Sequence, residues 1–114
     1  MQAVFVELPA FERHRAEYLD DPALHALQQA LLRHPELGPV VPQTGGLRKL
    51  RFALAGSHKG KRAGLRIIYY WWKAGNQFWL FTLYGKREMS DLSEQHKAIL
   101  RQVLRAELNQ RRAK

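Results

Sequence analysis

Basic side chains dominate the middle of the sequence, and carboxylates are missing from the same stretch. Between residues 37 and 87 of the 114-residue chain there are ten lysines or arginines and no aspartate or glutamate. They are Arg48, Lys49, Arg51, Lys59, Lys61, Arg62, Arg66, Lys73, Lys86 and Arg87. All ten acidic residues lie before or after this basic segment. Because like charges repel one another in a folded chain, this pattern favours a protein that binds a polyanion.

Three of these cations have the spacing that would let them bind the same phosphate group. Lys49 and Arg51 lie two residues apart in an alternating stretch, so a β-strand would present both on one face. An antiparallel neighbour would bring Arg66, near the start of the next apolar stretch, close to them. Arginine also offers a planar fork of donors that fits phosphate. The alternative is a solvated sheet face whose charges prevent edge-to-edge pairing.

Fewer groups are suited to proton transfer or to stacking. Glu88 is the first acid after the basic segment, and it can orient a cation or take a proton, or form a weak surface ion pair. His58 lies in a basic, glycine-rich loop, where it is either an acid or base or an exposed loop residue. Most of the aromatic residues at 69–84 are expected in the core, with Tyr70 and Tyr84 as candidates for stacking on bases.

Composition limits the class of protein. The length suits one domain over residues 1–114, and 46% hydrophobic residues exclude a disordered chain. There is no cysteine, no pair of histidines with metal-ligand spacing, no nucleophile motif and no phosphate-binding P-loop. No signal peptide or membrane span is recognisable, which predicts a soluble cytoplasmic protein. The formal charge of +9 favours nucleic acid as the partner, ahead of an acidic protein or a membrane surface.

The elements that must position these residues follow from apolar periodicity and turn signals. We predict strands over 3–7, 47–54, 65–73 and 77–84, and helices after Pro9, from a capping Asp21 to about His34, and from a capping Ser93 onward. Gly75-Asn76 predicts a two-residue hairpin turn. The inward stripe of the last helix is expected to be Ile99, Leu100, Val103, Leu104 and Leu108. The order β-α-α-β-β-β-α predicts a small α+β domain with a mostly antiparallel sheet.

Three stretches of the sequence, in this order and spacing, resemble the RelE/ParE superfamily of bacterial toxins, and most closely the HigB-like toxins that cleave mRNA. They are GGLRKLR at 45–51, GKRAGLRIIYY at 60–70 and LYGKREMSDL at 83–92. The resemblance covers nearly the whole chain and implies a RelE-like α+β fold that enters the ribosomal A site and cuts mRNA there. It also implies neutralisation by a cognate antitoxin, often a helix-turn-helix protein.

The resemblance assigns roles to residues. The cations that it places in the catalytic set are Lys49, Arg51, Arg66, Lys86 and Arg87, with Glu88 beside them. Beside this set, we expect RNA-binding contacts from Arg48, Lys59, Lys61, Arg62 and Tyr84, with Lys59, Lys61 and Arg62 on the RNA backbone. Some relatives carry a catalytic tyrosine in the C-terminal segment, where this chain has Ser93 or its neighbours.

The mechanism that we expect uses no metal and no cofactor, because the RNA supplies the nucleophile. The 2′-OH of the RNA attacks the adjacent phosphate, and Arg51, Arg66 and Arg87 stabilise the charge that develops. Lys49 or Lys86, helped by Glu88, moves protons, since a lysine crowded by cations loses its proton more easily. Two alternatives stay open: a ParE-like gyrase poison, which needs no phosphate-cleaving residues, and a non-catalytic nucleic-acid-binding module.

Overall fold

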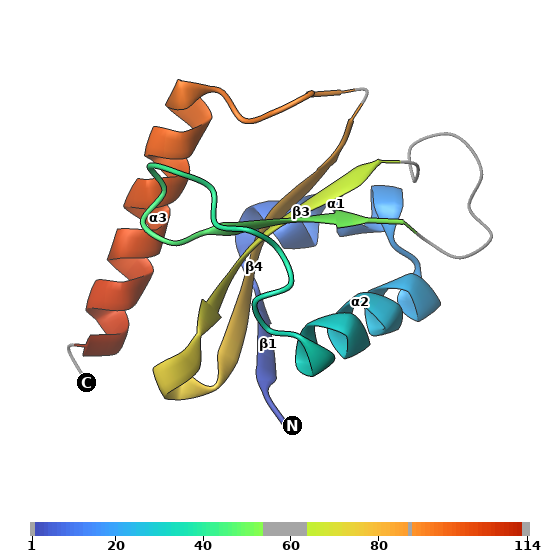
Figure 1. Ribbon diagram of the computed structural model, residues 1–114, viewed down its shortest axis with the longest axis horizontal. Coiled ribbons are helices and arrows are strands. Elements are labelled where there is room, and N and C mark those ends of the chain that lie inside the picture. The colour runs from blue at the N-terminus through green and yellow to red at the C-terminus, as the bar shows by residue number, and fades with distance from the viewer. Residues whose placement is uncertain (1, 54–63, 87, 113–114) are drawn as a thin grey trace.

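A four-stranded mixed sheet carries helices on both faces in the computed structural model, which describes residues 2–53, 64–86 and 88–112 (Figure 1). The elements are β1 (Val4–Glu7), α1 (Pro9–Tyr18), α2 (Asp21–Arg33), β2 (Arg48–Phe52), β3 (Leu65–Trp72), a 3-10 turn η2 (Lys73–Gly75), β4 (Gln77–Gly85) and α3 (Glu94–Arg112). This order confirms the predicted α+β class. No helix in the described ranges is long and apolar enough to cross a membrane.

The strand order in the sheet is β1-β4-β3-β2, so the two most apolar strands occupy the centre. β1 runs parallel to β4, whereas β4 with β3 and β3 with β2 are antiparallel. Helices α1 and α2 cover one face of the sheet and α3 covers the other, as Figure 1 shows. The near-continuous apolar sequence of β3 and β4 is explained by this burial on both faces.

Each face has its own hydrophobic cluster. On the α1 and α2 side, Phe11, Leu27 and Leu31 pack with Tyr69 and Phe78 of the central strands. The cluster on the α3 side contains Ile68, Trp79, Phe81, Tyr84, Leu92 and Leu104. The candidate site lies beside the α3 cluster, near the C-terminal ends of β2 and β4 and the N-terminal end of β3.

A bulge in β4 decides which way the end of that strand faces. Ile68 pairs with Thr82 and Tyr69 pairs with Leu80, which leaves Phe81 as an extra residue. An extra residue reverses the alternation of side chains beyond it. Tyr84 therefore lies in the cluster on the α3 side, although regular alternation from Leu80 would have turned it toward α1 and α2.

Three predicted details are wrong, each for a local reason. The cap of α2 is Asp20, whose Oδ1 accepts from the Ala23 N–H at 2.9 Å, because Asp21 is already helical. The β3–β4 connection spans Lys73–Asn76 rather than two residues, with Asn76 in the left-handed region at φ 55°. The stripe on α3 is narrower than predicted, since Ile99 and Val103 are 51% and 39% exposed. The cap at Ser93 is confirmed by a 3.1 Å bond from the His96 N–H to Ser93 Oγ.

The two neighbouring aspartates give a direct test of the α2 cap. We expect Asp20→Ala to lower the free energy of unfolding by about 1 kcal/mol, since it leaves the Ala23 N–H without its acceptor. Asp21→Ala removes the same charge from the same turn but no capping bond, so its effect should be smaller. Urea unfolding of both variants measures the difference, and equal losses would contradict the assignment of Asp20 as the cap.

Candidate functional site

Polar side chains from three strands meet in one row on the α3 side of the sheet. Arg51 of β2 pairs with Arg66 of β3, and Arg66 pairs with Tyr84 of β4. Directly paired residues point to the same face, and Tyr84 packs in the cluster on the α3 side. Lys49 lies two residues before Arg51 and opposite Ile68, so it shares this face. We call Lys49, Arg51, Arg66 and Tyr84 the strand site.

Arg66 is a buried cation whose donors are only partly used. Arg66 is only 7% exposed, and its Nη1 donates a hydrogen bond to the Gly64 carbonyl at 2.6 Å. Its buried Nε has no hydrogen-bond partner among the described residues, nor does a carboxylate lie within 4.0 Å of the guanidinium in those ranges. Burying a charge is costly unless it is paired and hydrogen-bonded. Arg66 is therefore a buried cation with an unused donor among the described residues.

Tyr84 presents a second unused donor next to Arg66. The residue is 6% exposed, and its buried hydroxyl finds no partner in the part of the chain that the structure describes. Burial raises the pKa of the Tyr84 phenol above its ordinary value, the Asp91 carboxylate raises it further and Arg66 opposes both. At neutral pH the hydroxyl therefore keeps its proton and can donate a hydrogen bond.

Gly64 brings Lys86 to the edge of the strand site. The Gly64 carbonyl accepts from Arg66 Nη1 and also, at 3.1 Å, from the backbone N–H of Lys86. Gly64 has φ +72°, and a Cβ there would lie 3.1 Å from Lys86 Cβ and 3.3 Å from Arg66 Nη1. A side chain at position 64 would therefore both strain the backbone and press on two cations. The Lys86 side chain itself is exposed.

Lys49 is neutralised by an acid that the sequence analysis did not single out. Its Nζ lies 3.1 Å from Asp91 Oδ1, and the same oxygen accepts from the Leu92 N–H at 2.8 Å. The Leu92 N–H and then the hydrogen bond from Lys49 hold the pKa of the Asp91 carboxyl below its usual value. The basic segment contains no acid in its sequence, but in the folded protein the Asp91 carboxylate lies next to one of its lysines. One indication of this ion pair is present in the sequence, namely that Asp91 follows Glu88 by only three residues.

Arg48 lies on the opposite face from the strand site. It pairs with Tyr69, whose side chain belongs to the α1 and α2 cluster. Its Nη1 donates to the Gly38 carbonyl at 2.8 Å, and its Nη2 lies 3.5 Å from Glu36 Oε2. These contacts fix the loop after α2, and they do not bring Arg48 together with the other candidates.

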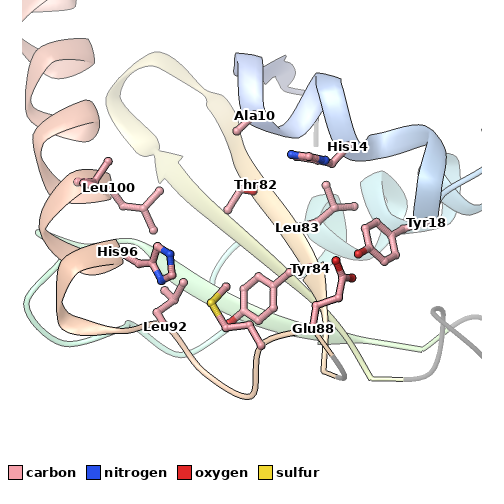
Figure 2. Close-up of a pocket in the computed structure, with 12 residues that line it drawn as sticks. Ala10, His14, Tyr18, Thr82, Leu83, Tyr84, Glu88, Leu92, His96 and Leu100 are labelled. Carbon is pink, nitrogen blue, oxygen red and sulfur yellow. The ribbon is translucent and has the colours of Figure 1, made fainter.

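A cavity of about 390 Å³ adjoins the strand site at Tyr84 (Figure 2). It lies between α1, the end of β4 and the start of α3, and Glu88 and His96 are among its lining residues. Glu88 is exposed, and its Oε1 accepts from the Gly85 N–H at 3.2 Å. Tyr70, the other stacking candidate, is half-buried and packs on Trp79 with ring centroids 5.4 Å apart.

Several predicted residues fall outside the described ranges. They are His58, Lys59, Lys61, Arg62 and Arg87. Within the described residues, no group of three or more histidine, aspartate or glutamate side chains is placed to hold a metal ion.

Comparison with known proteins places the fold. No model of a protein family matches the sequence. A solved structure of a mutant of the E. coli toxin RelE in the free state is similar to this chain, with a TM-score of 0.51 and 14% sequence identity. The similarity covers 79% of this chain and 90% of that one. The chain therefore has a RelE-like α+β fold, on which the strand site is built.

Proposed function

We propose that this chain is the toxin of a toxin–antitoxin pair, belongs to the RelE/ParE superfamily as a HigB-like member, and cleaves mRNA on the ribosome. The observation that carries the proposal is the pair of unused buried donors, Arg66 Nε and the Tyr84 hydroxyl, on neighbouring strands. Unsatisfied buried polar groups are rare and require an explanation. A phosphate bound on this face would accept from both, and a chain of formal charge +9 attracts such a group.

The reaction that suits this site is transesterification within the RNA. The 2′-oxygen bonds to phosphorus, the bond from phosphorus to the 5′-oxygen breaks, and the products are a 2′,3′-cyclic phosphate and a 5′-OH. Arg51, Arg66 and Arg87 stabilise the added negative charge of the transition state. Because these cations supply the charge and the RNA supplies the nucleophile, we propose that the protein needs no metal or cofactor for the chemistry.

Proton transfer falls to the lysines at the two sides of the strand site. Lys49 or Lys86 takes the proton from the 2′-OH and returns one to the 5′-oxygen. In the free protein Asp91 holds Lys49, so an incoming phosphate must compete with that carboxylate. Glu88 accepts a hydrogen bond from the Gly85 backbone N–H and lines the neighbouring cavity. We therefore assign it a role in that cavity rather than in proton transfer.

The partners follow from the same proposal. Lys59, Lys61 and Arg62 remain candidates for contacts with ribosomal or messenger RNA, and Arg48 could add to them only from the other face of the sheet. A cognate antitoxin, of the helix-turn-helix kind, is expected to cover the toxin in a cytoplasmic complex.

The decisive experiment adds purified protein to a ribosome programmed with an mRNA. A site with so few catalytic groups depends on its partner for alignment, which alone can supply roughly 7–11 kcal/mol of a barrier. We therefore expect efficient cuts within the coding frame on the ribosome and poor cleavage of the same RNA when naked. Primer extension maps the cuts, and end-group analysis should show a 2′,3′-cyclic or 3′-phosphate and a 5′-OH.

Two other outcomes would replace the proposal. Efficient cleavage of naked RNA would remove the ribosome from the mechanism. Intact RNA together with trapped gyrase–DNA complexes would assign the chain to the ParE-like branch, while intact RNA with tight binding would leave a non-catalytic nucleic-acid-binding module.

A further inference from the structure

The cavity beside the strand site has the character of a small-molecule site. Its volume of about 390 Å³ lies within the roughly 300–1,000 Å³ that such sites occupy. Apolar side chains form most of its wall, among them Leu83 of β4, Leu92 before α3, and Ile99 and Leu100 of α3. Its polar groups come from His14, Tyr18, Thr82, Tyr84, Glu88 and His96. A mainly apolar wall with a small set of polar groups that orient the ligand is typical of such sites.

The location of the cavity ties it to the phosphate site. Tyr84 lines the cavity and is also the direct strand partner of Arg66. Neighbouring strands are only about 4.8 Å apart, so the cavity begins one strand away from the cation that would hold the phosphate. Within one nucleotide the base lies a few bonds from its phosphate. A nucleotide held at Arg66 can therefore place its base in the cavity.

We propose that this cavity binds one unstacked nucleobase of the RNA strand, and that Glu88 selects bases that carry an exocyclic amino group. The proposal deepens the proposed function and rests on it for the identity of the strand, but the binding itself is separable from cleavage. Figure 2 shows Tyr84 between Glu88 and His96 in the view, with α1 and α3 on the two sides of the cavity. Tyr84, although buried, contributes to the cavity wall against which a base would pack.

The selectivity follows from the chemistry of the Glu88 carboxylate. An ionised carboxylate only accepts hydrogen bonds, and the Gly85 N–H already occupies Oε1. The other oxygen is suited to the amino group of adenine, cytosine or guanine. Uracil and thymine have no amino group, and their one ring N–H is flanked by two carbonyl oxygens that a carboxylate repels. We therefore expect these two bases to bind least well.

DNA hexamers test the cavity without any chemistry, because they lack the 2′-OH that acts as nucleophile. Fluorescence anisotropy with labelled oligodeoxyadenylate, oligodeoxycytidylate and oligothymidylate should give about tenfold weaker binding of the thymidylate, the size expected for one hydrogen bond to a charged group. Glu88→Gln should shrink this difference to about threefold or less, because an amide both donates and accepts. Equal binding of the three hexamers by the unmodified protein would overturn the proposal.

Two tryptophan substitutions on α3 form a matched pair that tests occupancy. Ile99 and Val103 are both exposed and lie one turn apart, but only Ile99 lines the cavity. Ile99→Trp should fill the cavity and remove the discrimination between hexamers, whereas Val103→Trp should retain it, and thermal melting checks that both variants fold. Unchanged discrimination in Ile99→Trp would place the base elsewhere.

The result separates this inference from the proposed function. If the protein binds hexamers base-selectively, loses this selectivity in Ile99→Trp and cuts no mRNA on the ribosome, the cavity is a base site but the proposed ribonuclease activity is wrong. If the protein cleaves mRNA on the ribosome but binds the three hexamers equally, the ribonuclease activity is supported and the base site is wrong. Failure of all three hexamers to bind would also overturn the cavity as a base site.

Discussion

Replacing Arg66 by methionine is expected to reduce mRNA cleavage on the ribosome by about 10²–10³-fold, the usual cost of removing one donor aimed at transition-state charge. The same change should leave the protein folded and no less stable. Arg66 is a buried guanidinium with no carboxylate within 4.0 Å among the described residues, so its burial costs free energy in the unliganded protein. A methionine side chain has a similar length and can be buried without the free-energy cost of a buried charge. The substitution also removes the hydrogen bond to the Gly64 carbonyl, which lowers stability and opposes this gain.

Two further variants make the Arg66 result interpretable. Arg105→Met removes the same charge from an exposed position on α3 and should cleave like the unmodified protein. Arg66→Lys keeps the charge but loses the planar fork, so its rate should lie between those of the methionine variant and the original. A folded Arg66→Met protein that cleaves normally would show that Arg66 is a structural cation and not part of the site.

The row of cations at the strand site was predictable because it depends on period-two alternation alone. Lys49 and Arg51 share a strand face in any regular register, and a two-strand antiparallel connection brings Arg66 opposite Arg51. The central position of β3 and β4 likewise followed from their continuous apolar sequence. The alternation in β2 and the apolar runs in β3 and β4 are local, each within fewer than ten consecutive residues, whereas the Arg51–Arg66 pairing needs in addition the antiparallel connection between β2 and β3.

Features that depend on irregular backbone or on distant partners were not predictable. The bulge at Phe81 leaves no signature in the sequence, yet it turns Tyr84 to the face of Arg66. The ion pair between Lys49 and Asp91 joins residues 42 positions apart, and only the packing of the segment before α3 brings them together. The same packing forms the cavity. Asp20 and Asp21 are chemically equivalent as caps, and only the path of the chain after α1 decides between them.

Tyr84→Phe should lower cleavage and yet not lower stability, and this combination distinguishes a functional hydroxyl from a structural one. We expect a loss of about 10²-fold in cleavage, since the hydroxyl is proposed to donate to the same phosphate as Arg66. The hydroxyl has no partner within the described ranges, so its removal relieves an unsatisfied buried group. The free energy of unfolding at pH 7 should stay level or rise by about 1 kcal/mol.

Tyr69→Phe is the matched control, because it removes a buried tyrosine hydroxyl from the opposite face of the same sheet. The Tyr69 hydroxyl donates to the Pro35 carbonyl at 2.9 Å and accepts from the Gly38 N–H at 3.0 Å. Its loss leaves two backbone groups unsatisfied and should cost about 1–3 kcal/mol while cleavage is unchanged. Tyr84→Phe is thus predicted to lower cleavage without lowering stability, and Tyr69→Phe to lower stability without lowering cleavage. Urea unfolding and the ribosome assay measure the two effects.

The pH dependence of stability provides an independent check on Tyr84. Burial raises the pKa of the Tyr84 phenol above its ordinary 10.0 in the folded protein, so above that pH the unfolded chain loses this proton first. The folded state then binds more protons than the unfolded state, and stability must fall as the pH rises. The same holds for Tyr69, because burial also raises the pKa of its phenol.

The free energy of unfolding, measured from pH 8 to 11, should therefore decline less steeply in Tyr84→Phe than in the unmodified protein. Tyr69 accounts for part of the slope that remains. An identical decline in both proteins would mean that the Tyr84 hydroxyl is not desolvated in the folded state, and its role as a protonated donor to phosphate would fail with it.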